Sequence, residues 1–496
     1  MAFRIPHNLL TEEHKIKIKK DLTLVEKKNW HTPKLYSKRK EITFYSVDVD
    51  TKEIFLPMHY AGELLKTPLI NRCRIYHKVP SFEFTTKLYD YQEEVVNISM
   101  KNFSSKGTTF LNVFCSYGKT VVAAYFAAMF AKTHGLLTLV TYPRVLIGKS
   151  WIGTFRKLTT AKIFIVGEDK EFTPDVNVIL CMNTRLPNLD INIRRKVGHF
   201  VIDEAHLYCT TSHVQCLLAI EPMCTTVLTA TYERDDGFHT MLDFLVGSER
   251  ITRISKKPFF VFYRPTPFEV TLEYNSFGVI YRSIIKQLDN NLARNSLILQ
   301  TVMDNLSEKI LIITTHVPHA KSLASWLEHY LKPLGKTVAL LAGNINQYHD
   351  SDVLVGTKSK IGVGFDEKES CLNWGGRRIN MLIALSIGKK IEQIAGRAFR
   401  AKYPFVVDIV DNNPQLNNHW NLRKKWYASR NGIIYEMNHR FCWKDLFPIA
   451  LQNYMSSLND TTFVNTEMSS FKPLQDNGDC ILQKQSNSLV RYLTNK

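Results

Sequence analysis

Short apolar runs alternate with longer segments of mixed polarity in two parts of the chain. Each short run favours a buried strand, and the longer segments between the runs favour helices. The expected strands of the first part are 111–114, 136–140, 163–166, 176–181, 200–202 and 226–228, and those of the second are 309–314, 338–341, 352–355 and 379–385. This alternation predicts mostly parallel sheets with flanking helices, and therefore an α/β fold in two domains.

The length of 496 residues exceeds what one core usually organises, so several domains are expected. We predict an N-terminal accessory module at 1–80, a first α/β domain at 81–245, a connector at 246–289, a second α/β domain at 290–440 and a tail at 441–496. Two basic, proline-containing stretches indicate the connector. The accessory module is interpreted either as a nucleic-acid- or partner-binding domain or as a solvated basic face. The tail is rich in Ser, Asn, Thr and Gln, and is expected to be loosely ordered or to bind a partner.

The net charge of +18 and the pI near 9.3 favour a polyanionic partner, either nucleic acid or an anionic membrane surface. A merely soluble basic protein is the simpler alternative. No apolar run reaches the roughly 20 residues that a membrane helix needs, and charged residues at 12–20 argue against a secretory signal. The nine cysteines form no C-x-x-C pair, which argues against a disulfide framework or a structural zinc site. We therefore expect a reducing intracellular compartment.

The clearest chemical signal is Gly118-Lys119-Thr120, which lies between the expected strand 111–114 and an expected helix at 121–134. A phosphate-binding loop typically connects a strand to the helix that follows it. Backbone N–H groups cradle the phosphates, the lysine meets the β and γ oxygens, and the hydroxyl ligates Mg²⁺. Two positions depart from the fuller pattern, because Val113 stands where glycine or alanine is usual and Ser116 stands where a further glycine is common. Ser116 retains a backbone N–H, so the loop is expected to survive.

A second signal follows the apolar run 200–202, which delivers Asp203 and Glu204 to the end of a buried strand, with His206 two residues later. Behind a phosphate loop, the first carboxylate suits Mg²⁺ and the second suits the activation of water. An ordinary solvated turn is the alternative. His206 and Thr229-Ala230-Thr231, which follows the next strand, can link the nucleotide to neighbouring loops.

Three further positions in the first domain suit ligand contacts. Gln92 precedes the phosphate loop, and its side-chain amide can both donate to and accept from an adenine edge. Pro143-Arg144 and Thr184 each follow an expected strand, where open α/β sheets place their ligands. A surface glutamine and plain strand-to-loop turns are the alternatives.

The second domain contains Gly364-Phe365-Asp366 shortly after an expected strand, and an expected helix at 390–400. On that helix Gln393, Arg397 and Arg400 are spaced by four and three residues, so they share one face. Such a face is either a solvated surface or a source of arginine fingers that stabilise charge at a γ-phosphate.

Taken in order, these motifs resemble those of superfamily 2 helicases over roughly residues 85–412. The set is Tyr91-Gln92, Gly118-Lys119-Thr120, Asp203-Glu204-Ala205-His206 (a DEAH box), Thr229-Ala230-Thr231, Gly364-Phe365-Asp366 and Gln393 to Arg400. Arg234-Asp235-Asp236-Gly237 is similar to the XPB-type branch. The spacing from Thr357 to Gly364 is similar to that of the transcript-release DNA helicases of poxviruses and of related helicases of large DNA viruses.

The resemblance implies two tandem RecA-like domains, with ATP and Mg²⁺ as cofactors. It also implies that the protein moves along nucleic acid, DNA rather than RNA, and acts in viral transcription. Partners would include the transcription machinery and no membrane, and the location would be the host cytoplasm and the virion. By this resemblance, catalysis would involve Asp203, Glu204, His206, Gln393, Arg397 and Arg400, and the metal would be bound by Thr120 and Asp203. The nucleotide would be bound by Gln92, Ser116, Gly118, Lys119, Thr120, Gly364 and Asp366. The nucleic acid would be contacted by Pro143, Arg144, Thr184 and Thr357. A duplex translocase of a restriction or remodelling system, and a nucleic-acid-binding scaffold whose ATPase has decayed, are the other hypotheses.

Overall fold

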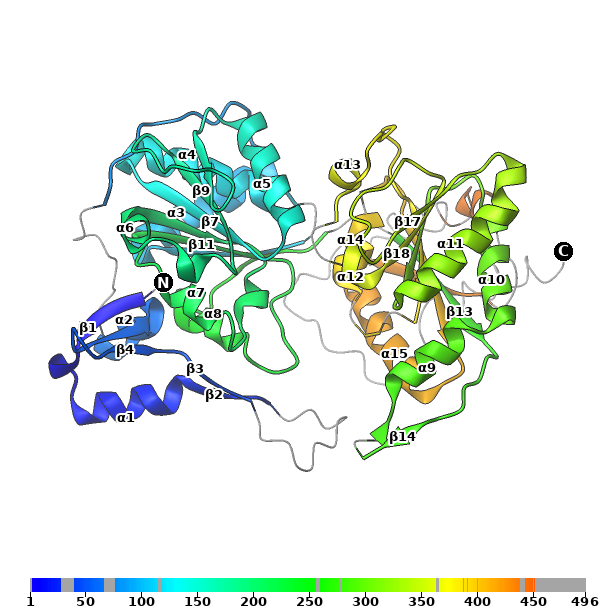
Figure 1. Cartoon of the computed structure of the whole chain (residues 1–496), viewed down its shortest axis with the longest axis horizontal. Coiled ribbons are helices and arrows are strands. Elements are labelled where there is room, and N and C mark those ends of the chain that lie inside the picture. The colour runs from blue at the N-terminus through cyan, green and yellow to red at the C-terminus, as the bar shows by residue number, and fades with distance from the viewer. Residues whose placement is uncertain are drawn as a thin grey trace, which may run out of the picture. The chain divides into compact units, whose positions relative to one another are not determined.

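The computed structural model describes residues 2–27, 40–66, 76–114, 117–255, 259–276, 278–362, 365–386, 388–389, 391–398, 400–437, 442–448 and 450. The chain divides into two compact units, Met1–Ile254 and Ser255–Lys496 (Figure 1). Among the described residues, no helix combines the length and the apolar character needed to cross a membrane.

The first unit begins with a small module of two antiparallel sheets and two helices. Its elements are β1 (Ala2–Pro6), α1 (Glu12–Asp21), β2 (Thr23–Val25), β3 (Glu41–Thr43), β4 (Ser46–Asp48), β5 (Glu53–Pro57) and α2 (Met58–Leu65). The strands pair in the orders β1-β5-β4 and β2-β3. The module is anchored to the rest of the unit by an ion pair of 2.9 Å between Arg4 and Glu221, and by edge-to-face packing of Tyr60 on Phe244.

The main sheet of the first unit has seven parallel strands in the order β12-β6-β11-β10-β7-β9-β8. These strands are β6 (Thr108–Val113), β7 (Leu137–Tyr142), β8 (Ile163–Ile165), β9 (Val178–Met182), β10 (Val197–Ile202), β11 (Cys224–Thr229) and β12 (Ile251–Arg253). The helices are α3 (Asp90–Lys106), α4 (Lys119–His134), α5 (Val145–Leu158), α6 (Ile191–Lys196), α7 (Val214–Leu218) and α8 (Thr240–Val246). Strands β7, β10 and β11 are buried at every position, as expected when helices cover both faces of a parallel sheet.

The second unit contains a second parallel sheet of seven strands, in the order β17-β18-β16-β19-β20-β13-β21. The strands are β13 (Phe259–Thr266), β16 (Ile310–Thr314), β17 (Val338–Leu341), β18 (Val353–Thr357), β19 (Met381–Leu385), β20 (Phe405–Asp411) and β21 (Gly432–Glu436). The helices are α9 (Tyr281–Asp289), α10 (Leu292–Met303), α11 (Val317–Leu331), α12 (Lys358–Ile361), α13 (Glu367–Ser370), α14 (Glu392–Ala398) and α15 (Pro414–Ser429), and β14 (Tyr274–Asn275) pairs with β15 (Gly278–Val279).

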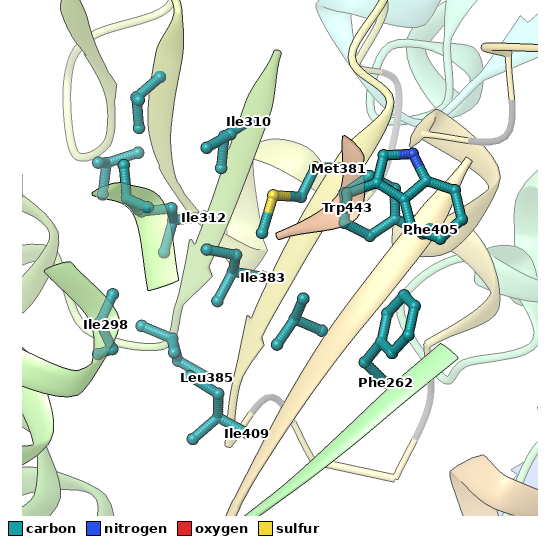
Figure 2. Packing of buried hydrophobic residues seen from close by; sticks show 14 of the residues in the cluster. Phe262, Ile298, Ile310, Ile312, Met381, Ile383, Leu385, Phe405, Ile409 and Trp443 are labelled. Carbon is teal, nitrogen blue, oxygen red and sulfur yellow. The ribbon is translucent and has the colours of Figure 1, made fainter. Parts of the chain in front are cut away.

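Alternate side chains of the central strands form the core on one face of this sheet. Figure 2 shows Ile312 of β16, Ile383 of β19 and Ile409 of β20 in one layer with Ile298 of α10. Trp443 extends the cluster, since its ring stacks on Phe405 at 4.4 Å between centroids. The two sheets confirm the predicted α/β fold with tandem RecA-like domains.

The segment 246–289, predicted to be a connector, contains the boundary between the two units and contributes elements to both. Strand β12 extends the first sheet beside β6, and β13 lies between β20 and β21 in the second sheet. Pro265 lies in β13 with β20 alone beside it, because β21 pairs only with Phe259–Tyr263. A proline is tolerated where one side of a strand has no partner.

Candidate nucleotide and nucleic-acid site

Five strands of the first sheet end at one edge, because parallel strands all point the same way. Loops that leave this edge carry Gly118-Lys119-Thr120 after β6, Pro143-Arg144 after β7, Thr184 after β9, Asp203-Glu204 after β10 and Ala230-Thr231 after β11. Ligands of open α/β sheets bind outside the carboxyl ends of the strands. The fold therefore gathers at one edge the first-unit residues singled out in the sequence.

The candidate phosphate-binding loop ends at Gly118, the N-cap of α4. Gly118 has φ +93°, a region that L side chains rarely adopt, and an added Cβ would lie 2.4 Å from Nε2 of Gln92. Lys119 and Thr120 then form the first turn of α4, whose N-terminal N–H groups and dipole suit phosphate. Val113 is the buried last residue of β6, so its isopropyl group packs in the core. Ser116 lies outside the described residues.

The side chain of Gln92 is hydrogen-bonded to this loop. It is only 3% exposed, its Nε2 donates to the carbonyl of Tyr117 at 3.2 Å, and its Oε1 accepts from the N–H of Tyr89 at 3.1 Å. One N–H and one lone pair of the amide remain for a base edge. Beside it, Tyr89 and Tyr91 stack at 5.4 Å between centroids and are both exposed. These rings offer the loop an aromatic surface.

Asp203 and Glu204 are both nearly buried, at 6% and 8% exposed. The Asp203 carboxylate accepts the indole N–H of Trp151 at 2.9 Å through Oδ2 and the N–H of Glu204 at 2.9 Å through Oδ1. Burial, together with the adjacent Glu204 carboxylate, raises the pKa of Asp203 above its ordinary value, and the charge of Lys119 partly offsets this. Lys119 thus lies within electrostatic reach of Asp203.

Glu204 has a left-handed backbone with φ +49°, which is uncommon for a residue other than glycine. Such a turn directs the glutamate away from the strand, and its Oε2 lies 3.6 Å from Nδ1 of His206. The same Nδ1 is 2.9 Å from Oγ1 of Thr229 and 3.3 Å from Oγ1 of Thr231. His206 therefore links the acidic pair to the Thr229-Ala230-Thr231 segment.

Two side chains of this network were not identified as site residues in the sequence. Arg234 donates from Nη1 to the carbonyl of His206 at 2.8 Å, and it forms a two-pronged ion pair with Asp236. Trp151 contacts Asp203 directly. Arg234 lay within a motif used only for the resemblance, whereas a tryptophan in an amphipathic helix gives no local signal of a polar partner.

The nucleic-acid candidates fall into two groups. Arg144, the N-cap of α5, and Thr184 are exposed and Pro143 is half-buried, all at the edge that carries the acidic pair. Thr357 is instead completely buried at the end of β18, and its hydroxyl lies 3.1 Å from that of Ser359. Contact between Thr357 and a bound strand stays a prediction.

In the second unit, Arg400 forms an ion pair with Asp366. Asp366 also caps α13 by accepting the N–H of Lys368 at 2.9 Å. Burial opposes ionisation of Asp366, but Arg400 and this N–H outweigh it and lower its pKa. Gln393 and Arg397 lie on α14, but their side chains are outside the described residues, as is Gly364.

The donors present fit Mg²⁺ bound together with a nucleotide. The described residues contain no group of three or more His, Cys, Asp or Glu side chains that could hold a metal alone. Asp203 and the hydroxyl of Thr120 are hard oxygen donors, and Mg²⁺ is typically bound by one or two such groups plus phosphates and water. Burial and the neighbouring Glu204 carboxylate raise the pKa of Asp203, and a bound cation would stabilise its ionised form.

Residues 85–234 match the family model described as "Type III restriction enzyme, res subunit". The chain is 26% identical over 386 residues to "Putative helicase 161L" of Invertebrate iridescent virus 6, covering 71% of this chain and 84% of that protein. It is also 26% identical over 353 residues to "Putative helicase 055L" of Frog virus 3, covering 70% and 78%. A structure of "S. cerevisiae Dbp5 L327V bound to RNA and ADP BeF3" matches with a TM-score of 0.48 and 13% identity, covering 72% of this chain and 93% of that chain. The chain is therefore similar to viral putative helicases and, over residues 85–234, to the restriction-enzyme family.

Proposed function

We propose that this protein hydrolyses ATP at the carboxyl edge of its first sheet and uses the energy to move along nucleic acid. One observation carries the proposal: the loop before α4 and the acidic pair after β10 meet at one edge, with Lys119 in electrostatic reach of Asp203. A phosphate cradle facing a buried carboxylate pair is the arrangement that phosphoryl transfer requires.

Each residue has a distinct role in this proposal. The N-terminus of α4 and Lys119 bind the phosphates, while Thr120 and Asp203 hold Mg²⁺, which when bound neutralises charge on the phosphate oxygens. Glu204 orients the attacking water and accepts its proton. His206, hydrogen-bonded to Thr229, relays the state of the site to the neighbouring loop.

Arg397 and Arg400 are proposed to act as arginine fingers, which stabilise negative charge at the transferring phosphate. Arg400 is paired with Asp366 in this structure. Its role in hydrolysis therefore requires that the guanidinium exchange this carboxylate for phosphate. Arginine suits such an exchange because its planar fork binds both anions in two-pronged geometry.

DNA is the proposed track and viral transcription the proposed process. This is supported by the net charge of +18, by the exposed Arg144 and Thr184 at the site edge and by the resemblance to viral transcript-release helicases.

We also propose a reducing intracellular location in the infected cell. Among the described residues, Cys181, Cys209 and Cys216 are buried free thiols. Fractionation of infected cells and virions tests the location, and recovery only from an oxidising compartment would refute it.

The second candidate is a translocase that moves on duplex DNA without unwinding it, which the restriction-enzyme description of the matched family favours. A strand-displacement assay with a labelled duplex separates the two, because release of the labelled strand with ATP requires unwinding. ATP hydrolysis with no strand release would favour the translocase. A scaffold with a decayed ATPase is disfavoured by the intact Lys119 and Asp203-Glu204, and measurable hydrolysis would exclude it.

A further inference from the structure

The indole of Trp151 donates a hydrogen bond to the carboxylate of Asp203. Trp151 lies on α5 and is fully buried, and its Nε1 is 2.9 Å from Oδ2 of Asp203. The two residues are 52 positions apart and belong to different elements. This contact lies within the protein core, not in solvent.

Packing leaves the indole little freedom. The ring stacks on Phe155 one turn further along α5, at 5.8 Å between centroids, and α5 packs against α4, β7 and β9. Helix α4 is also the helix whose first turn carries Lys119 and Thr120. Because a close-packed ring cannot rotate without displacing its neighbours, the direction of its N–H is fixed relative to the phosphate loop.

The two oxygens of Asp203 are thereby fixed from two sides. Oδ2 accepts the Trp151 indole and Oδ1 accepts the N–H of Glu204. A carboxylate oxygen has two lone pairs, so each oxygen retains one for another partner. Together the two N–H groups restrict rotation of the carboxylate and therefore the directions of these remaining lone pairs.

We propose that Trp151 is a positioning residue for Asp203, which orients that carboxylate toward Mg²⁺ in the Mg²⁺–nucleotide complex. The inference rests on the proposed function, because it takes Asp203 as a metal ligand. Donors that orient a ligating carboxylate typically change metal affinity about 10- to 100-fold when they are removed. A tryptophan that only filled the core would affect stability and leave the metal dependence unchanged.

Trp151→Phe tests this, since it removes the N–H and keeps an aromatic ring. The full-length protein is titrated with Mg²⁺ in the presence of a fluorescent ATP analogue, and binding is read without any hydrolysis. The Mg²⁺ concentration for half-maximal effect is expected to rise about tenfold or more, with little change in binding of the analogue in the absence of Mg²⁺.

Tyr208→Phe is the matched control. Tyr208 is fully buried in the same unit, and the variant loses one buried hydrogen bond, to the hydroxyl of Thr141 at 3.0 Å. Its Mg²⁺ dependence is expected to equal that of the wild type. Wild-type Mg²⁺ dependence in a folded Trp151→Phe protein would overturn the proposal.

The outcomes separate this inference from the function on which it rests. If the wild type shows no Mg²⁺-dependent nucleotide binding, the proposed function itself has failed. If Trp151→Phe does not fold, hydrogen exchange of the wild-type segment 145–158 replaces it. Mg²⁺ with the nucleotide analogue is then expected to slow exchange there more than the analogue alone, and equal exchange would overturn the proposal.

Discussion

Replacing Asp408 by alanine would leave a guanidinium buried in the second unit without its counter-charge. Asp408 lies on β20 with no exposed surface, and it accepts from Nε and Nη2 of Arg423 at 2.8 and 2.7 Å. The hydroxyl of Tyr427 donates to the same carboxylate at 3.0 Å. Arg423 is itself only 2% exposed, so water cannot replace the lost partner.

The expected cost follows from this burial. Removing one member of a buried ion pair typically costs about 3–5 kcal/mol, because the remaining charge stays desolvated. Replacing both members, by Asp408→Leu with Arg423→Met, leaves no buried charge and is expected to cost less than Asp408→Ala alone. Arg423 also donates to the carbonyl of Gly388, just before α14, so the single variant is expected to slow ATP hydrolysis as well.

Urea denaturation followed by hydrogen exchange of peptides from β19 and β20 measures the second unit by itself. A loss of about 4 kcal/mol is expected to lower its midpoint by more than about 1 M. Lys162→Met is the control, because Lys162 pairs with Asp175 at the surface, where solvent screens the two charges and the loss of stability is expected to be small. A loss below about 1 kcal/mol for Asp408→Ala, or a double variant less stable than the single one, would refute this reasoning.

Three further variants test other parts of the account. Gly118→Ala places a Cβ against Gln92 at a left-handed φ. It is expected to lower the free energy of unfolding by about 1–3 kcal/mol in thermal denaturation and to weaken ATP binding. Unchanged ATP binding would contradict this. Burial lowers the pKa of His199 to about 3, so the folded state stays neutral while the unfolded state gains a proton below about pH 6.5. The free energy of unfolding should therefore fall by up to about 1.4 kcal/mol per pH unit from pH 6 to 4. In acid-denaturation curves, His199→Gln should remove this part of the dependence of stability on pH. Equal dependence in the variant and the wild type would exclude His199 as its source. Arg400→Ala should abolish ATP hydrolysis but not binding of a fluorescent ATP analogue, and full hydrolysis would exclude its finger role.

The sequence predicted the fold well where the signal is local. Apolar runs with regular spacing marked most strands of both sheets, and the motifs then fell at strand ends because parallel strands share a carboxyl edge. Strand β13 was not predicted, because the apolar run Phe259–Phe262 is short and lies between two proline-containing stretches. The one-sided pairing that tolerates Pro265 is a tertiary feature.

The contacts that complete the site could not be predicted from local pattern. Trp151 and Asp203 meet across 52 residues, and Arg234 reaches back 28 residues to the carbonyl of His206. Neither pair has a characteristic spacing, because each depends on how helices pack on the sheet. The burial of Thr357 at the end of β18 is likewise a property of the packed sheet and not of its local motif.

ATP hydrolysis by the full-length chain tests the central claim most directly. It is measured in parallel without nucleic acid and with single-stranded DNA, duplex DNA and RNA, with Lys119→Ala and Glu204→Gln as controls. The account predicts hydrolysis that one polymer stimulates, DNA above RNA, and that both variants abolish. Absence of hydrolysis with every polymer, or hydrolysis that persists in both variants, would contradict it.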